Sequence, residues 1–265
     1  MAAEISAALV KELREQTSAP MMDCKRALQE TDGDLEEAKR WLRERGMAQA
    51  AKRAGRETKE GLVGYRVNDG KGTIVAVGCE TEPVSKNDEF QAFAKKVLDT
   101  VDVQGVGAES ALDEERQALS GKLGENIVVV GTAQFSAGED ELVTGYAHPP
   151  ANKLGVLVML RGGDEELGRK VAMHVAALNP VWVARDAVPE EDVARERDIF
   201  ANSDEVQSKP EQARERIVEG MLNKRFFAAN VLVDQEWVHD SSKTVGQALQ
   251  EAGAEVVDFA RLSVS

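Results

Sequence analysis

The residues best suited to act on another molecule stand in a short turn, residues 80–87, between a strand-like and a helix-like run. Glu82 carries a carboxylate, and it is followed by the apolar residues Pro83 and Val84 and then by Ser85. An acid and two apolar groups on a stiff corner indicate a probe that meets another molecule. The alternative is an ordinary strand-to-helix connection whose outermost residues only face water. Both interpretations stay open at this point.

Two regular elements would hold this turn in place. Residues 73–79 form a β-branched, apolar run with glycines at 72 and 78, which predicts a strand. Asp88 is the expected N-cap of the following helix, with Gln91 completing a capping box. The apolar residues of that helix recur at helical spacing, which predicts one buried face: Phe90, Phe93, Ala94, Val97, Leu98 and Val101.

Other motifs for chemistry are missing from the sequence. It contains no phosphate-binding glycine loop, no dinucleotide-binding motif and no nucleophile elbow. The histidines, His148, His174 and His239, are too far apart for zinc-ligand spacing. His174 shares a helix face with apolar residues, which predicts either a hydrogen-bonded core histidine or an interface group. We therefore expect no enzyme, no cofactor and no metal site.

Length and composition indicate a globular protein. At 265 residues the chain is long enough for two or more domains, and its hydrophobic share of 42% is typical of folded proteins. No apolar run approaches the ~20 residues of a membrane span, and the first residues do not resemble a signal segment. Only two cysteines occur, Cys24 and Cys79, so we expect the reducing cytoplasm as the location.

The negative charge is unevenly distributed. The net charge is −14, yet residues 1–55 hold ten Lys/Arg and ten Asp/Glu, so the remainder carries all of it. An acidic body repels phosphate backbones and anionic lipids, which argues against nucleic acid or a membrane as the main partner. The charge is compatible with a protein partner or simply with solubility.

The chain opens with a predicted module of three short helices, residues 1–55. Met21 and Met22 begin its second helix, and flexible thioethers suit apolar docking. Gly46 is the expected stop of the third helix. A polar linker follows at residues 52–60.

The rest of the chain reads as a duplicated α+β core with antiparallel strands, with halves at residues 56–140 and 141–265. Each half reads as a hairpin, helices, a glycine and a strand, and the segments after Gly124 and Gly253 hold corresponding places. An Asp-Gly pair at 69–70 predicts the turn of the first hairpin. Residues 189–227 interrupt the second half with two polar helical runs, which predict a protruding antiparallel helical pair.

Several motifs in order resemble the bacterial elongation factor Ts family. The first spans residues 9–17 and 21–28, and the second joins Gly78-Cys-Glu-Thr81 to Val84, Lys86 and residues 90–94 and 97–98. Residues 172–177, 217–220 and 242–246 continue the match, so the resemblance covers nearly the whole chain.

The resemblance implies a guanine-nucleotide exchange factor that binds elongation factor Tu, both GDP-bound and nucleotide-free. It implies a helical module similar to ubiquitin-associated domains, docked on the partner's nucleotide domain, and a tip at Glu82, Pro83, Val84 and Ser85 that displaces magnesium and promotes GDP release. We also expect contacts from Met21, Met22, Phe90 and His174. The complex is one-to-one or a two-to-two dimer. The alternative function is an adaptor that binds proteins without exchange activity.

One departure from the family pattern concerns the tip. The family usually has Asp-Phe-Val-Ala after the threonine, whereas this chain has Glu82-Pro83-Val84-Ser85. The acid is retained in type, but the aromatic wedge is missing. Either Pro83 or Val84 would have to take its place.

Overall fold

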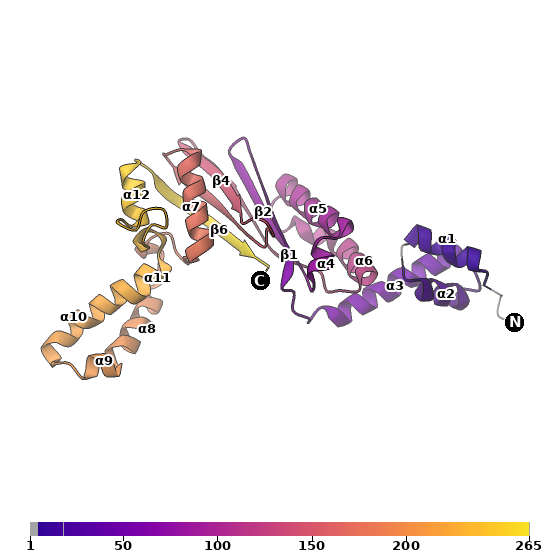
Figure 1. The fold of residues 1–265 in the computed structure, drawn as a ribbon, viewed down its shortest axis with the longest axis horizontal. Coiled ribbons are helices and arrows are strands. Elements are labelled where there is room, and N and C mark those ends of the chain that lie inside the picture. The colour runs from indigo at the N-terminus through magenta and orange to yellow at the C-terminus, as the bar shows by residue number, and fades with distance from the viewer. Residues whose placement is uncertain (1–4, 18, 265) are drawn as a thin grey trace.

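Two antiparallel three-stranded sheets form the centre of the molecule. The computed structural model describes residues 5–17 and 19–264, and its mixed architecture confirms the predicted α+β class (Figure 1). The first sheet has the order β1 (Glu60–Asn68), β2 (Lys71–Cys79), β3 (Val128–Ser136). The second repeats it with β4 (Glu141–Ala147), β5 (Leu154–Arg161), β6 (Glu255–Ser263). Each half of the core therefore contributes a hairpin and a later third strand, as the sequence predicts.

The β1–β2 hairpin turns at the predicted Asp-Gly pair. Asp69 and Gly70 both have positive φ, at 49° and 75°. This left-handed pair matches the right-handed twist of the flanking strands, and Asp-Gly is among the sequences that adopt it most readily. The turn thus fixes the register in which Asn68 pairs with Lys71.

The two sheets pack face to face, and glycines let them approach closely. A Cβ added to Gly145 on β4 would lie 2.3 Å from the ring of Tyr65 on β1. Likewise, a Cβ on Gly155 would lie 2.6 Å from Val63. Large side chains of the first half thus fill spaces that the second half leaves open. Buried apolar residues from both sheets complete this inner layer, among them Ile74 and Leu157.

Helices cover the outer faces of the two sheets. On the first sheet lies α5 (Asp88–Gln104), against which α6 (Asp113–Leu123) packs after the short turn η1 (Ala108–Leu112). On the second sheet lies α7 (Glu165–Leu178), with α12 (Val245–Glu251) beside β6 (Figure 1). Within the described residues, none of the helices has the length and apolar character that crossing a membrane requires.

The N-terminal module consists of α1 (Ala7–Thr17), α2 (Met21–Glu30) and α3 (Leu35–Arg53). The prediction that Gly46 ends the third helix is wrong, because α3 continues for seven residues beyond it. Gly46 instead lies where α3 crosses α6, and a Cβ on Gly121 of α6 would approach the Gly46 Cα to 2.8 Å. Two glycines therefore allow the backbones of module and core to touch.

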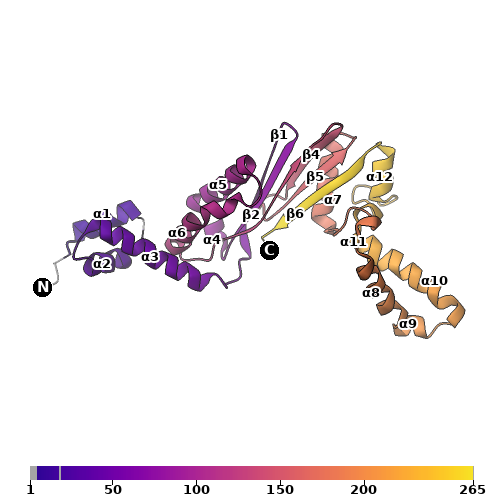
Figure 2. The same cartoon turned by 180° about the vertical axis from the view of Figure 1, so that it is seen from behind.

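A helical pair stands at the opposite end of the molecule (Figure 2). The first predicted run coincides with α8 (Glu190–Ala201), and α9 (Asp204–Gln207) connects it to α10 (Glu211–Met221). The chain then runs through a π-helical turn, η3 (Leu222–Phe227), and α11 (Ala228–Asn230). The short turns η2 (Arg185–Ala187) and η4 (Leu232–Asp234) lie at its base. Buried residues between the helices, including Val206 and Leu222, give the pair a small core of its own.

Candidate functional site

The four residues Glu82–Ser85 form a single-turn helix, α4, which we call the tip. It stands where the sequence predicts only a turn. Pro83 lies in the first turn, where its missing N–H leaves no helical hydrogen bond unmade. Ser85 is buried, and its hydroxyl donates to the carbonyl oxygen of Glu82 at 2.8 Å. The tip is thus closed by its own hydrogen bond as well as by the proline ring.

The side chains of the tip point to two sides. Glu82 and Pro83 are exposed, and the Glu82 side chain keeps 63% of its surface accessible. Val84 is half-buried against the apolar cluster beneath α5. Of the four residues expected to meet a partner, the structure presents a carboxylate and a proline ring outward. Val84 and Ser85 anchor the turn from below.

Glu82 is held in its ionised form by a neighbour. Lys86 Nζ lies 2.7 Å from Glu82 Oε1, and this hydrogen bond, with the lysine's charge, lowers the pKa of the carboxyl group. Both side chains are largely exposed, so water screens the pair and the lysine can move away easily. A carboxylate is therefore available at the tip at neutral pH.

The helix beneath the tip begins one residue earlier than predicted. Asn87, rather than Asp88, is the N-cap of α5, and its Oδ1 accepts the N–H groups of Glu89 at 2.9 Å and Phe90 at 3.3 Å. No capping box forms with Gln91, whose amide reaches the carbonyl oxygen of Ser85 at 3.5 Å instead. The cap directs Phe90 inward, where it has no exposed surface. Phe90 was expected to contact a partner, but its side chain lies in the core and supports the tip.

The module presents an apolar pair of its own. Met21 and Met22 occupy the first turn of α2 and are 53% and 65% exposed. Exposed methionines are unusual for a protein surface, because thioethers bury well and adapt to the shape of what covers them. The structure therefore leaves both side chains accessible.

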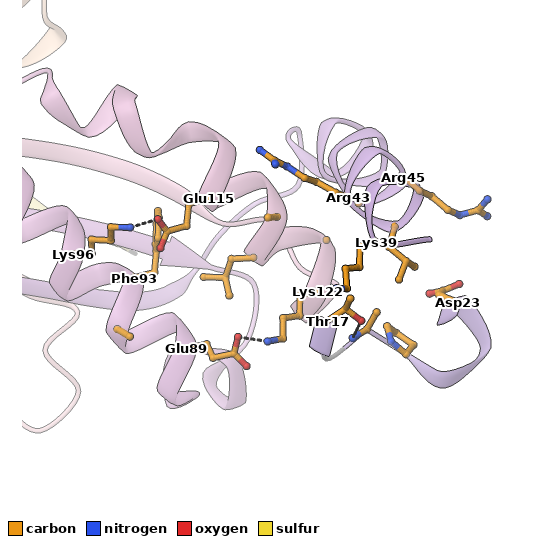
Figure 3. Close-up of a pocket in the computed structure, with 18 residues that line it drawn as sticks. Thr17, Asp23, Lys39, Arg43, Arg45, Glu89, Phe93, Lys96, Glu115 and Lys122 are labelled. Carbon is orange, nitrogen blue, oxygen red and sulfur yellow. Dashed lines mark hydrogen bonds and ion pairs between the residues drawn. The ribbon is translucent and has the colours of Figure 1, made fainter. Parts of the chain in front are cut away.

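A cleft of about 550 Å³ separates the module from the core helices α5 and α6. Pro20 and Asp23, which flank the methionine pair, line its module side. Its apolar lining comes from Leu42, Phe93 and Leu119 together with small residues of both walls. Figure 3 shows that the walls belong to helices distant in sequence.

Cations and acids both line this cleft. The cations are Lys39, Arg43, Arg45, Lys96 and Lys122, and the acids are Asp23, Glu89 and Glu115. On the core side Lys96 pairs with Glu115 and Lys122 with Glu89 (Figure 3). On the module side Arg45 stacks over the Trp41 ring at 4.9 Å. Lys39 pairs with Glu36 at 2.6 Å, and Arg43 pairs with Glu114 of α6. The cleft thus offers an apolar floor surrounded by ion pairs.

His174 lies in the core of the second half. Its side chain has no exposed surface, and its Nε2 lies 2.9 Å from Gln235 Oε1. Nδ1 accepts the N–H of Val238 at 3.3 Å, so the proton is on Nε2 and donates to Gln235. Burial lowers the pKa of the ring, which is therefore neutral. Of the two predicted roles, this geometry is that of a hydrogen-bonded core histidine. A direct contact with a partner does not fit it.

Sequence patterns did not predict the cleft, although two residues that line it, Gly46 and Phe93, were predicted as a helix stop and as part of a buried helix face. Lys39 and Lys122 stand 83 positions apart, and each reads locally as a charge on the solvated face of a helix. The only local signal was the pair of glycines, 46 and 121, whose helical positions are otherwise unfavourable. Neither glycine reveals its partner, so the cleft emerges only when the helices cross.

Comparisons with known proteins agree with this architecture. The family model described as elongation factor TS matches residues 80–265. Curated relatives named elongation factor Ts match almost the entire chain. The one from Stutzerimonas stutzeri is 42% identical over 268 residues, which covers 99% of this chain and 91% of the relative. The one from Ruegeria pomeroyi is 41% identical over 273 residues, with 98% and 92% covered.

Proposed function

The chain belongs to the elongation factor Ts family, whose members act as the nucleotide exchange factors of elongation factor Tu in translation elongation, and from this premise we propose how its parts share the task. The tip displaces the magnesium ion from the partner's nucleotide site. The module and the second half of the core hold the partner in place. No covalent chemistry is required of any residue in this scheme.

Exchange follows from linkage between two ligands of one protein. If the exchange factor binds nucleotide-free elongation factor Tu more tightly than the GDP-bound form, GDP and the exchange factor each weaken the other's binding by the same factor. The partner's magnesium ion neutralises the nucleotide's phosphates. Removing it raises the free energy of the bound nucleotide and speeds its release.

The exposed Glu82 carboxylate is the observation that carries this proposal. Carboxylate oxygen is a ligand that Mg²⁺ prefers, and a carboxylate near the nucleotide repels the negatively charged phosphates. Pro83 adds a rigid ring beside it with a fixed φ, so the turn can press against a neighbouring loop without yielding. Val84 and Ser85 support the turn and do not themselves need to reach the nucleotide.

The module contributes affinity in this proposal. Met21 and Met22 supply apolar contact, and the adjacent cleft accepts a helix or loop of the partner's nucleotide domain on its apolar floor. Phe90 and His174 act indirectly by supporting the surfaces above them. We propose the module at 1–55 and the core halves at 56–140 and 141–265 as the working units, with a helical hairpin at about 189–227.

The proposed partners are GDP-bound and nucleotide-free elongation factor Tu in the cytoplasm, in a one-to-one or two-to-two complex. Neither a membrane nor direct nucleic-acid binding is part of the proposal, because the net charge of −14 repels anionic surfaces. The alternative, an adaptor without exchange activity, would also use the module and the helical pair. It would not need the tip.

Release of fluorescent GDP from purified elongation factor Tu tests the proposal directly. We expect the wild-type chain to accelerate release, and the double variant Glu82→Ala, Pro83→Gly to accelerate it much less while still binding the partner. Glu139→Ala, an exposed acid in the β3–β4 turn, is the matched control and should behave as wild type. A double variant as active as the control would refute the role of the tip. Binding without any acceleration by the wild-type chain would favour the adaptor.

A further inference from the structure

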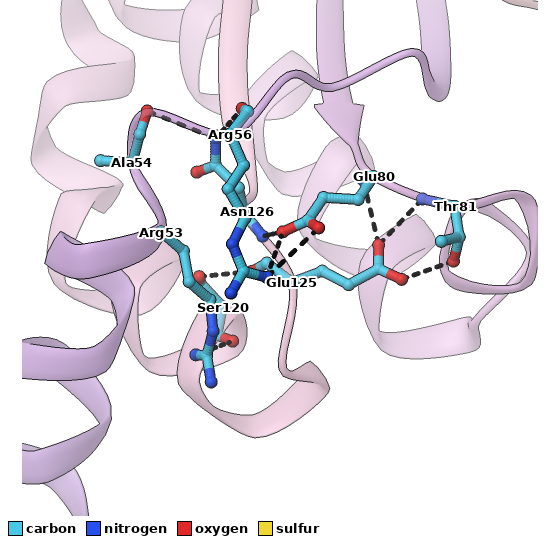
Figure 4. A network of polar contacts seen from close by, with 8 residues as sticks. All are labelled: Arg53, Ala54, Arg56, Glu80, Thr81, Ser120, Glu125 and Asn126. Carbon is cyan, nitrogen blue, oxygen red and sulfur yellow. Dashed lines mark hydrogen bonds and ion pairs between the residues drawn. The ribbon is translucent and has the colours of Figure 1, made fainter.

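The tip begins where two paired strands separate. β2 and β3 pair up to Gly78 and Val128, and beyond these residues their backbones no longer bond to each other. From this point on, side-chain carboxylates accept the backbone N–H groups of the two chains (Figure 4). Glu125 Oε2 accepts the backbone N–H of Glu80 and that of Thr81, both at 3.0 Å. Its other oxygen accepts the hydroxyl of Thr81.

A second carboxylate makes the reciprocal contact. Glu80 Oε1 accepts the backbone N–H of Asn126 at 2.6 Å, so the two acids cross between the diverging chains. Asn126 is 2% exposed, and its amide donates to the carbonyl oxygen of Arg56 at 2.8 Å. The same corner is thereby tied to the linker that leaves α3.

The backbone of Glu125 is fixed by a hydrogen bond and by the turn that precedes it. Ser120, which is 1% exposed, donates its hydroxyl to the backbone carbonyl oxygen of Glu125. Gly124 ends α6 with φ of +79°, a conformation that a residue with a side chain adopts only with strain. The chain therefore turns sharply and delivers the Glu125 side chain to the corner.

These contacts determine the direction in which the tip leaves the sheet. Thr81 is the N-cap residue of α4, yet its hydroxyl donates to Glu125 and makes no capping hydrogen bond to the helix. The residue immediately before Glu82 is thus fixed at its backbone and its side chain by one carboxylate. Hydrogen bonds to an ionised acceptor are roughly twice as strong as neutral ones.

We propose that Glu125 is a positioning residue for nucleotide exchange, which holds the tip in the orientation that acts on the partner. This inference rests on the proposed function of the tip. Glu125 does not touch the partner's nucleotide in this proposal. It acts through Thr81, so its loss should lower the release rate at saturating exchange factor more than it lowers affinity for the partner.

Four variants test the inference: Glu125→Ala, Glu125→Gln, Thr81→Val, and Glu125→Ala combined with the tip double variant. We expect Glu125→Ala to slow maximal GDP release about tenfold, a factor within the usual range of coupling between sites. Affinity for nucleotide-free elongation factor Tu should change by less. Amide hydrogen exchange at residues 80 and 81 should accelerate. The control is Glu251→Ala, which removes the ion pair between Glu251, on the distant α12, and Lys243.

Glu125→Gln should recover most of the rate. Its amide oxygen can still accept both backbone N–H groups, and its NH₂ can donate to the Thr81 hydroxyl. Thr81→Val removes a single hydrogen bond at an exposed position, so it folds even if Glu125→Ala does not, and it should slow release by a smaller factor. Recovery in the glutamine variant would show that geometry matters here more than charge.

The combined variant separates the inference from the proposed function. If Glu125 acts through the tip, Glu125→Ala should slow release no further once Glu82 and Pro83 are replaced. Equal slowing in both backgrounds would overturn the inference, as would a wild-type rate in both Glu125→Ala and Thr81→Val. If the tip double variant alone releases GDP at the wild-type rate, the proposed function fails and the inference falls with it.

Discussion

Replacing His174 with phenylalanine should remove a pH dependence of stability that the wild-type chain carries. The neutral ring is enclosed, donates to Gln235 at 2.9 Å and stacks on Trp237 with ring centroids 5.2 Å apart. Burial lowers the pKa of this ring below its usual 6.5. A proton added at low pH would put a charge in the core and would leave Val238 N–H without its acceptor.

The sign of the effect follows from proton binding in the two states. Below pH 6.5 the unfolded chain binds a proton on His174 that the folded chain does not, so acid favours unfolding. The free energy of unfolding should fall by up to about 1.4 kcal/mol for each pH unit between the unfolded and the folded pKa values. Above pH 6.5 the ring is neutral in both states and contributes no slope.

The phenylalanine variant should differ from the wild type in two ways: its free energy of unfolding is lower at neutral pH, and it lacks the pH dependence due to His174. It leaves the Val238 N–H and Gln235 Oε1 without partners, which should cost about 1–3 kcal/mol each at neutral pH. Phenylalanine cannot titrate, so the difference in the free energy of unfolding between wild type and variant should narrow as the pH falls from 7.5 to 5.5.

Urea denaturation followed by circular dichroism at pH 5.5, 6.5 and 7.5 measures this difference. Carboxylates titrate equally in both proteins, so they cancel in the difference. His239→Gln is the matched control: His239 is exposed, so this variant should retain most of the pH dependence of stability. A difference that stays constant across this pH range would refute the reasoning, since it would mean that the folded His174 titrates normally.

Two further predictions concern the tip's supporting helix and the attachment of the module. Asn87→Ala should lower the free energy of unfolding by about 1 kcal/mol, the usual cost of a lost N-cap, and Asp88→Ala should lower it less. Urea denaturation midpoints, compared at an unchanged slope, measure both effects, and a larger effect at Asp88 would contradict the observed cap. Gly121→Val should weaken binding to elongation factor Tu in calorimetric titrations without changing the melting of the core, because the new side chain must separate α6 from Gly46. Gly220→Val is the control, because a Cβ at Gly220 meets nothing within 4 Å. Equal loss of binding in both variants would show that the close contact between Gly46 and Gly121 does not matter for binding.

Local patterns predicted most of the regular elements correctly. Residues 73–79 lie in β2, and α8 spans the predicted Glu190–Ala201, because β-branched runs and helical spacing report the burial that each segment needs. The Asp-Gly turn was predictable because few residues adopt two successive positive φ angles. The N-cap of α5 was misplaced by one residue, since Asn87 and Asp88 have similar capping preference and only the helix axis distinguishes them.

Tertiary contacts explain what the sequence could not predict. Gly46 is a good helix stop by propensity, but the close crossing with Gly121 keeps α3 helical through it. His174 was predicted with two roles, and only the position of Gln235, 61 residues later, distinguishes them. The segment after Gly124 was noticed as a mark of duplication, whereas its contacts with Thr81 depend on how β2 and β3 separate.

The glycine contacts between the two sheets link the evolution of the two halves of the core. Tyr65 fills the space over Gly145, so a larger residue at 145 is tolerated only if residue 65 becomes smaller at the same time. The same reciprocity joins Val63 to Gly155. We therefore expect substitutions in the two halves to be coupled, and a chimera that takes its halves from two distant relatives to have mismatched inner faces.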